Sequence, residues 1–304
     1  MHIYSHPACL LHNPGPAHPE HPQRLQTVID ALRAALGERV SWQRAPRASN
    51  AQLLRAHGAR MVADLRRGTN GETPRNLDAD TVMSAGSLEA GLRAAGAVCA
   101  AIDAVVAGSS RRAFCAVRPP GHHSSADQAA GFCLFNPIAV GARHARAAHG
   151  VQRIAIVDFD VHHGNGTQAI FAADASILFV SSQQIPLYPG SGLECETGIG
   201  NLVNGLLAPG DGSAEFRALW SDRLLPAIDR YAPDLMLVSA GFDAHRLDPL
   251  ADLNLGADDY GWITRELVAL AERHAQGRLV STLEGGYSLT ALRESSVAHV
   301  TALL

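Results

Sequence analysis

Short apolar runs rich in branched residues alternate along this chain with longer stretches of helical periodicity. The expected strands cover residues 113–117, 154–157, 177–181, 235–239 and 279–283. Before and between these runs, apolar residues recur every three or four positions, as in the stripe from Leu88 to Val105. Continuous apolar strands separated by amphipathic helices are typical of a parallel sheet that helices cover on both faces. The sequence therefore predicts an α/β fold.

The rest of the chain fits one α/β domain. Further helical stripes are expected over residues 25–36, 216–228 and 263–270, where the apolar side chains form core. The segment 183–212 is rich in Gly and Pro and is predicted to be a long loop system over the sheet edge. The 304 residues are 47% hydrophobic and 18% charged, and no linker or shift of composition divides them. We expect a single domain over residues 1–304.

One strand end is unusually polar. Asp158, Asp160 and His162 alternate with apolar residues directly after the expected strand 154–157, so in an extended chain their side chains point the same way. Burying two carboxylates costs several kcal/mol apiece unless a cation or dense hydrogen bonding compensates them, and no Arg or Lys of the segment does so. A metal site is the simplest interpretation. The alternative is an Asp/His hydrogen-bond network that closes the strand end.

Three other expected strands also end in polar clusters. These clusters are Arg-Pro-Pro-Gly-His-His at 118–123, Gly-Phe-Asp-Ala-His at 241–245 and Glu-Gly-Gly-Tyr at 284–287. Each cluster alone is ambiguous, because a histidine pair is often on the surface and Gly-Gly-Tyr is often a turn. Open α/β sheets bind ligands at the carboxyl ends of their strands, so four clusters at equivalent ends predict one functional site.

Composition argues against several classes of function. The net charge is −4 and no basic block occurs, which disfavours nucleic-acid binding through phosphate neutralisation. No run approaches the roughly 18 apolar residues of a membrane helix, and the N-terminus does not resemble a signal peptide, so we expect a soluble cytoplasmic protein without a membrane partner. The cysteines are odd in number and lack CxxC spacing, so they are expected to be reduced packing residues: Cys9, Cys99, Cys115, Cys133 and Cys195. The chain contains no lysine.

Together these motifs resemble the histone deacetylase superfamily, and most closely its bacterial class II-like deacetylases. The similarity runs from His-Pro-Glu-His-Pro-Gln-Arg-Leu at 18–25 to Leu-Glu-Gly-Gly-Tyr at 283–287. It implies the arginase/deacetylase fold, a single-domain open parallel sheet of about eight strands flanked by helices. It also implies one Zn²⁺ per chain bound by Asp160, His162 and Asp243, with coordination positions left open for water and substrate.

The resemblance also implies which residues are catalytic. His122 and His123 match the family's tandem histidines, with Asp158 as the partner of the first and Asn165 as the partner of the second. Because an asparagine is neutral, His123 is expected to be the less basic of the two. The implied reaction is hydrolysis of an acylated amine. Zinc polarises the amide and acidifies a water molecule, His123 carries the proton, and Tyr287 donates to the oxyanion.

The resemblance further implies a substrate channel. Gly131 and Phe132 match one wall of this channel, and Tyr188 matches the opposing aromatic residue. Leu250 stands where polyamine-selecting relatives place a glutamate. Because leucine offers nothing to a second ammonium group, acyl-lysine-type amides are favoured over acetylpolyamines as substrates.

Other positions carry over from the resemblance with a second interpretation open. Gly285 and Gly286 would allow the backbone turn that aims Tyr287 at the metal. Asp80 matches an aspartate at the channel rim that grips the substrate backbone, and a solvated loop carboxylate is the alternative. Arg24 matches an arginine below the site, and a structural salt bridge is the alternative. A monovalent cation, K⁺, is implied at residues that contribute mostly backbone carbonyls: Asp158, Asp160, His162, Ser181 and Ser182.

Two rival functions are considered. An arginase-type ureohydrolase shares the fold but needs two manganese ions, and the segment 241–245 supplies one aspartate where a binuclear site would use two. A catalytically silent acyl-lysine binding protein would not need the complete set of catalytic residues. The sequence leaves open the physiological substrate, the acyl-chain preference, the oligomeric state and the native metal, since ferrous iron or cobalt also suits such ligands.

Overall fold

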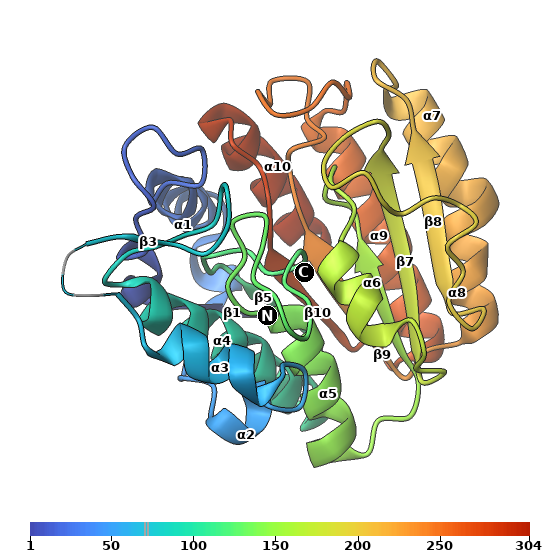
Figure 1. The fold of residues 1–304 in the computed structure, drawn as a ribbon. Coiled ribbons are helices and arrows are strands. Elements are labelled where there is room, and N and C mark those ends of the chain that lie inside the picture. Colours follow the sequence, from blue (N-terminus) through green and yellow to red (C-terminus); the bar gives the residue numbers. More distant parts are fainter. Residues whose placement is uncertain (70, 72) are drawn as a thin grey trace.

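Eight parallel strands form the central sheet, in the order β2-β1-β5-β10-β9-β6-β7-β8 (Figure 1). The computed structural model describes residues 1–69, 71 and 73–304. The strands of the sheet are β1 (His2–Ser5), β2 (Ser41–Arg44), β5 (Arg112–Cys115), β6 (Ile154–Asp158), β7 (Ile177–Gln184), β8 (Leu202–Leu207), β9 (Leu235–Ala240) and β10 (Leu279–Leu283). A separate antiparallel pair joins β3 (Arg75–Asn76) to β4 (Val82–Met83).

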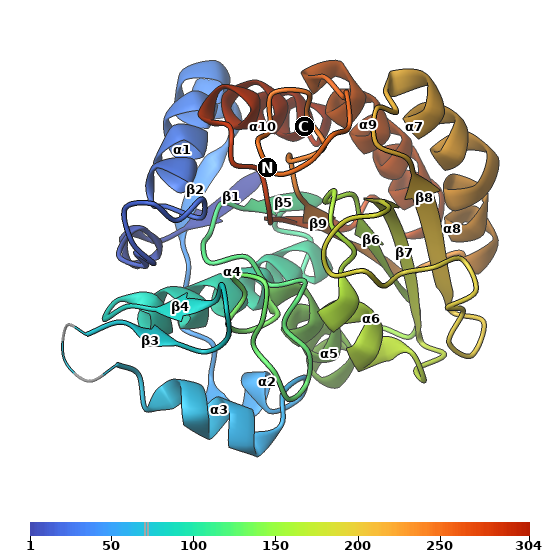
Figure 2. The same ribbon diagram turned by 45° about the horizontal axis from the view of Figure 1, so that its top comes forward.

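Helices cover both faces of the sheet, as Figure 2 shows from above. One layer contains α1 (Gln23–Leu36), α10 (Leu289–Ala302), α9 (Ala257–His274), α7 (Ser213–Leu219) and α8 (Leu225–Tyr231). The other contains α4 (Ser87–Val106), α5 (Pro137–His149), α2 (Asn50–Leu53), α3 (Ala59–Arg66) and α6 (Asn165–Phe171). The remaining helical turns are η1 (Pro7–Leu10), η2 (Gly37–Arg39) and η3 (Trp220–Leu224). The predicted doubly covered α/β fold is confirmed.

The central strands are buried along their whole length. Every residue of β6, β7, β9 and β10 is buried, which explains why these strands appear in the sequence as continuous apolar runs. All five predicted strands are present, and none of their ends differs from the prediction by more than three residues. The strands β1 and β2 were not predicted, because they are four residues long and their apolar content is low.

The prediction of one long loop system over residues 183–212 is wrong. The strand β7 continues to Gln184, and the edge strand β8 lies within this segment. Asn204 and Gly205 interrupt the apolar residues of β8, so its sequence lacks the continuous pattern of a buried strand. Backbone hydrogen bonds to β7 stabilise this strand, although its local sequence does not favour the strand conformation.

The helical stripe at 216–228 is divided. The helix α7 passes through one π-helical turn, η3, into α8. Pro226 lies in the first turn of α8 and has no N–H to donate to the carbonyl four residues earlier. A local change of hydrogen-bonding pattern before a proline accommodates that missing donor.

The cysteines are all free. Four of them are buried, as expected for packing residues: Cys9, Cys99, Cys115 and Cys133. Cys195 is exposed, so the expectation that it packs in the interior is wrong. Among the described residues, no helix is both long and apolar enough to cross a membrane.

The strand order brings the four polar clusters together. The strands β5, β10, β9 and β6 are consecutive neighbours in the middle of the sheet, and all run in the same direction. Their carboxyl ends therefore open onto one region, where the segments at 118–123, 158–165, 241–250 and 284–288 meet. This region is the candidate active site.

Candidate active site

Two carboxylates and one imidazole converge at the end of β6. His162 Nδ1 lies 3.1 Å from Asp160 Oδ1 and 3.2 Å from Asp243 Oδ2. The candidate ligand atoms of the three residues lie within 4.8 Å of one another, and all three residues are buried. These side chains do not converge because the chain is extended, as the sequence predicted. The strand β6 ends at Asp158, and the backbone bends over residues 160–162. Asp160 Oδ1 accepts the amide hydrogen of His162 at 2.9 Å, which holds the bend.

This group fits a metal ion. Asp243 Oδ2 is buried and, apart from its 3.2 Å approach to His162 Nδ1, has no hydrogen-bond partner in the part of the chain that the structure describes. The other carboxylate oxygens are oriented by backbone amides, from Val161 to Asp243 Oδ1 at 2.9 Å and from Gly285 to Asp160 Oδ2 at 2.8 Å. Although burial lowers it, the carboxylates of Asp160 and Asp243 raise the pKa of His162 to about 10. The pocket therefore favours positive charge, and a cation held by two oxygens and one nitrogen would supply it.

Glycine is required on two sides of the group. A Cβ at Gly285 would overlap carboxylate oxygens of both Asp243 and Asp160, and a Cβ at Gly241 would overlap Asp160. Gly286 has φ of 116°, a conformation that L residues with a side chain rarely adopt. The predicted turn at Gly285 and Gly286 thus has two separate causes, close approach at the first glycine and backbone conformation at the second.

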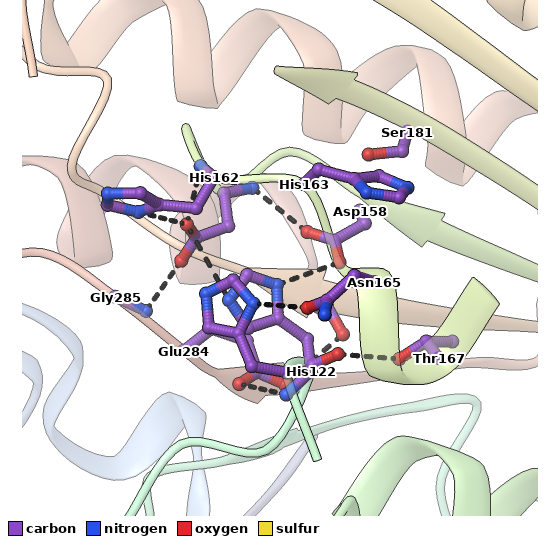
Figure 3. Close-up of polar contacts among 12 residues, drawn as sticks. His122, Asp158, His162, His163, Asn165, Thr167, Ser181, Glu284 and Gly285 are labelled. Atoms are coloured by element: carbon purple, nitrogen blue, oxygen red, sulfur yellow. Dashed lines mark hydrogen bonds and ion pairs between the residues drawn. The ribbon is translucent and has the colours of Figure 1, made fainter. Parts of the chain in front are cut away.

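His122 is held on two sides (Figure 3). Its Nδ1 donates to Asp158 Oδ2 at 3.0 Å, and its amide donates to Glu284 Oε2 at 3.2 Å. Burial opposes the charged form, but Asp160 and Asp158 raise the pKa of His122 well above its ordinary value. Glu284 belongs to the Glu-Gly-Gly-Tyr motif at 284–287, but the sequence alone indicates no role for it. Its position directly after β10 was the available signal.

His123 has the opposite character. Its Nδ1 donates to Asn165 Oδ1 at 2.8 Å, at the start of α6, so a neutral ring keeps a lone pair on Nε2. Burial, then the charges of His122 and His162, lower the pKa of His123 well below its ordinary value. The two histidines, whose ring centroids are 4.0 Å apart, therefore differ in basicity in the order that the sequence predicts.

The aromatic residues border the same group. The ring centroid of Tyr188 lies 5.0 Å from that of His123 and 6.4 Å from that of His162, and the Tyr188 side chain is 43% exposed. Phe132 packs edge-to-face against Tyr287 at 5.8 Å. Burial raises the pKa of Tyr287 well above its ordinary value, so its hydroxyl stays a proton donor at neutral pH.

The predicted rim residue Asp80 belongs to a hydrogen-bonded loop beside Phe132. The amide of Phe132 donates to Thr81 Oγ1 at 3.1 Å, and His18 Nε2 donates to the Asp80 carbonyl at 3.0 Å. The His18 ring also packs edge-to-face on Phe132, with centroids 4.6 Å apart. Burial, with the nearby Asp78, raises the pKa of Asp80. Sequence reasoning gave His18 and Thr81 no individual role, because each acts through a contact distant in sequence.

The positions predicted to bind a monovalent cation, and the predicted wall residue Gly131, also lie near the site, and their roles stay predictions. Ser181 is paired with Asp158 across β6 and β7, and its hydroxyl donates to Gln183 Oε1 at 2.8 Å. Ser182 Oγ accepts from the indole of Trp220 at 3.2 Å. The monovalent cation at these residues stays a prediction. Gly131 has φ of 55°, and its Cα lies against the His123 ring, where a Cβ would overlap it.

A second group of metal-ligand types lies away from this site. Asp103 Oδ1 accepts from His144 Nε2 at 2.7 Å and from His149 Nε2 at 2.6 Å, between α4 and α5. Arg55 donates to His144 Nδ1 at 3.0 Å. The neutral His144 ring therefore carries its proton on Nε2 and does not offer that atom to a metal. We assign this group as a hydrogen-bonded cluster centred on Asp103.

Comparison with known proteins identifies the family. Residues 18–303 match the sequence profile of the histone deacetylase domain. The chain belongs to the histone deacetylase family. The structure superposes on the crystal structure of the HD domain of HDA15 with a TM-score of 0.94 and 32% identity, covering 99% of this chain and 88% of that one. The predicted family and fold are both confirmed.

Several histone deacetylase relatives are similar in sequence. The chain is 41% identical over 275 residues to the histone deacetylase-like amidohydrolase of Pseudomonas aeruginosa, covering 89% of this chain and 72% of the relative. It is 38% identical over 294 residues to a probable deacetylase of Archaeoglobus fulgidus, covering 94% and 81%. Type-2 histone deacetylase 2 of Dictyostelium discoideum is 41% identical over 245 residues, but the chain spans only 14% of that protein. The family and these names support a hydrolase that acts on amide bonds.

Proposed function

We propose that this chain is a zinc-dependent amidohydrolase that removes acyl groups from acyl-lysine-type amines, with residues 1–304 as its catalytic domain. The observation that supports this proposal best is a proton acceptor beside a three-ligand metal site. The ring centroid of His123 lies 6.0 Å from that of the candidate ligand His162, and Asn165 leaves His123 Nε2 free to accept a proton. The cytoplasmic location stays a prediction.

The candidate metal ligands are Asp160, His162 and Asp243, which leave positions open for water and substrate. A bound zinc ion would supply Lewis-acid polarisation of the substrate carbonyl and of the attacking water. His123 accepts the proton of that water on Nε2 and returns a proton to the leaving amine. Its lowered pKa keeps the ring neutral, and therefore able to act as a base, before the reaction.

Two other side chains stabilise charge during this reaction. His122 stays protonated because Asp160 and Asp158 raise its pKa, so it places a fixed positive charge beside His123. Tyr287 donates its hydroxyl to the oxyanion of the tetrahedral intermediate, a contribution on the order of 3 kcal/mol for donors of this kind. Both effects require little reorganisation, because buried partners already hold these residues.

The substrate class is proposed from the channel walls. Phe132 and Tyr188 would line the methylenes of an acylated lysine, at about 0.8 kcal/mol for each methylene buried. Leu250 is half-buried on the loop after β9 and offers no charge to a second ammonium group. Acylated lysine is therefore proposed ahead of acetylpolyamines, which remain the alternative within the family.

The test is release of amine by metal-free protein to which zinc is returned. The substrates are an acetyl-lysine peptide, a trifluoroacetyl-lysine peptide, N-acetylputrescine and arginine. Zinc-restored cleavage of either lysine substrate, faster than that of N-acetylputrescine, is the expected result. Cleavage of arginine with manganese alone, with every amide left intact, would replace the proposal with a ureohydrolase.

The geometry does not favour the ureohydrolase. At the position where a binuclear site would use a second carboxylate, the chain has His245, whose Nδ1 accepts from the amide of Leu247 at 3.2 Å. Among the described residues, only Asp160, His162 and Asp243 form a metal-ligand group at this edge of the sheet. One metal ion per chain is therefore proposed.

A further inference from the structure

One carboxylate joins the loop after β9 to the start of α10. Asp248 is 7% exposed, and its two oxygens accept three backbone hydrogen bonds. Oδ1 accepts from the amide of Leu250 at 3.1 Å. Oδ2 accepts from the amides of Tyr287 at 2.7 Å and Ser288 at 3.3 Å. The residue proposed to donate to the oxyanion and the residue proposed to line the channel are thus attached to the same side chain.

The backbone around Tyr287 needs such an acceptor. The first amides of a helix and those just before it have no partner within the helix. Ser288 is the N-cap of α10, and its own hydroxyl accepts from Ala291 at 3.4 Å. That contact does not satisfy the amides of Tyr287 and Ser288 themselves. Asp248 accepts both of them and also places negative charge at the positive end of the α10 dipole.

The position of Asp248 carries an electrostatic cost. Burial, with the charge of Asp243 in the same loop, raises the pKa of Asp248 to about 7. A buried carboxylate near a second carboxylate is retained only where strong hydrogen bonds offset the cost, and the 2.7 Å bond from the Tyr287 amide is short enough to be charge-assisted. A neutral apolar residue here would avoid the cost but leave these amides without an acceptor.

We propose that Asp248 is a positioning residue that fixes the backbone of Tyr287, and through Leu250 the adjacent channel wall, relative to the candidate metal ligands. This inference rests on the proposed amidohydrolase function. Arg24 contacts the ring of Tyr287, with its guanidinium carbon 4.7 Å from the ring centroid, so the ring and the amide are held independently. Displacing a catalytic group by about 1 Å can cost on the order of 10²-fold in rate.

The first test compares Asp248→Asn and Asp248→Ala with wild type. An amide side chain keeps one oxygen acceptor but presents NH₂ groups to the other backbone amides, whereas alanine removes every acceptor. For Asp248→Asn we expect kcat for the acetyl-lysine peptide to fall about 10- to 100-fold with KM changed less than about threefold, and a larger fall for Asp248→Ala. Zinc content should be unchanged. Asp211→Asn is the matched control, because Asp211 also accepts a backbone amide, from Ala208 at 2.8 Å, but in an exposed turn.

A double-mutant cycle separates positioning from general damage. If Asp248 acts through the Tyr287 hydroxyl, Asp248→Asn should reduce the remaining rate of Tyr287→Phe less than about threefold. An equal loss in both backgrounds would overturn the proposal, and so would wild-type kcat in Asp248→Asn.

Hydrogen exchange keeps the proposal testable if the protein cleaves none of the amides. In Asp248→Asn, exchange should accelerate at least about tenfold at the amides of Tyr287 and Ser288 and remain as in wild type in β6. Unchanged exchange at these two amides would refute the positioning role. Absence of amide cleavage by wild type with accelerated exchange in the variant would instead refute the proposed amidohydrolase and leave the structural contact established.

Discussion

The guanidinium carbon of Arg24 lies 4.7 Å from the centroid of the Tyr287 ring. Arg24 is buried, pairs with Glu20 at 2.8 Å and donates to the Glu284 carbonyl at 2.6 Å and to the Gly286 carbonyl. Glu20 also pairs with the buried Arg118. Arg24 therefore forms a structural salt bridge and also contacts the ring of Tyr287. The proposed oxyanion donor is fixed by the same buried charges that join α1 to the end of β10.

Removal of the Tyr287 hydroxyl should affect turnover more than binding. We expect Tyr287→Phe to reduce kcat by about 10²-fold or more, corresponding to about 3 kcal/mol, with KM nearly unchanged. The phenyl ring keeps its packing against Phe132 and Arg24, so the melting temperature should stay close to that of wild type. Steady-state kinetics on an acetyl-lysine peptide checks this, and a proportional rise of KM would contradict the assigned role. Unchanged peptide binding with lost turnover would also exclude the silent binding protein.

The space around the candidate metal site should not tolerate a methyl group. A Cβ at Gly285 would overlap carboxylate oxygens of Asp160 and Asp243, so Gly285→Ala should bind well under one zinc per chain. Gly212→Ala is the control, because the nearest atom to its Cβ would be at an ordinary 3.7 Å. Zinc content after dialysis measures the effect. Full zinc occupancy in Gly285→Ala would show that the metal, if bound, uses a different arrangement.

A charge at Leu250 should change the substrate preference. With Leu250→Glu, we expect the ratio of kcat/KM for N-acetylputrescine to that for the acetyl-lysine peptide to rise about fivefold, because a partly exposed ion pair with the second ammonium is worth about 1 kcal/mol. Leu250→Gln controls for polarity without charge and should move the ratio little. An equal change in both variants would mean that loop shape, not charge, determines the preference.

A buried histidine should make the protein sensitive to acid. His299 lies between Thr264 Oγ1 at 2.6 Å and Ser281 Oγ at 2.8 Å, and burial lowers its pKa to about 3. Between pH 6.5 and 3 the unfolded chain binds this proton and the folded chain does not, so stability falls with falling pH. His299→Gln should lower the free energy of unfolding at pH 7 but reduce its pH slope by up to about 1.4 kcal/mol per pH unit.

Urea unfolding of His299→Gln and wild type at intervals from pH 7 to pH 4 measures this slope. Parallel stability curves for the two proteins would show that His299 does not titrate differently on folding. A steeper curve for the variant would contradict the sign.

The local chemistry of the site followed from the sequence, because each polar cluster directly follows an apolar run. Such adjacency is a property of the chain itself. The segment 158–162 predicted a metal group, and the structure does place Asp160 and His162 together. The predicted reason was wrong, since the chain bends after Asp158. The sequence contains the residue types and their spacing, whereas backbone direction after a strand depends on hydrogen bonds such as that from the His162 amide to Asp160.

The sequence does not predict the edge strand β8 or the contacts of His18 and Asp248. A strand with a polar centre forms because a neighbour offers unpaired backbone groups. The contacts from His18 to Phe132 and from Asp248 to Tyr287 join residues far apart in the chain, and no local pattern marks such pairs.

The sequence by itself determined the fold class and the residues able to perform chemistry, because hydrophobic periodicity and side-chain type are written along the chain. The tertiary structure decided that β5, β10, β9 and β6 are neighbours, so that four separate clusters share one site. It also decided how far the pKa values of His122 and His123 move apart, because burial and neighbouring charges act through space. Position in space, rather than position in the chain, sets the strength of an electrostatic interaction.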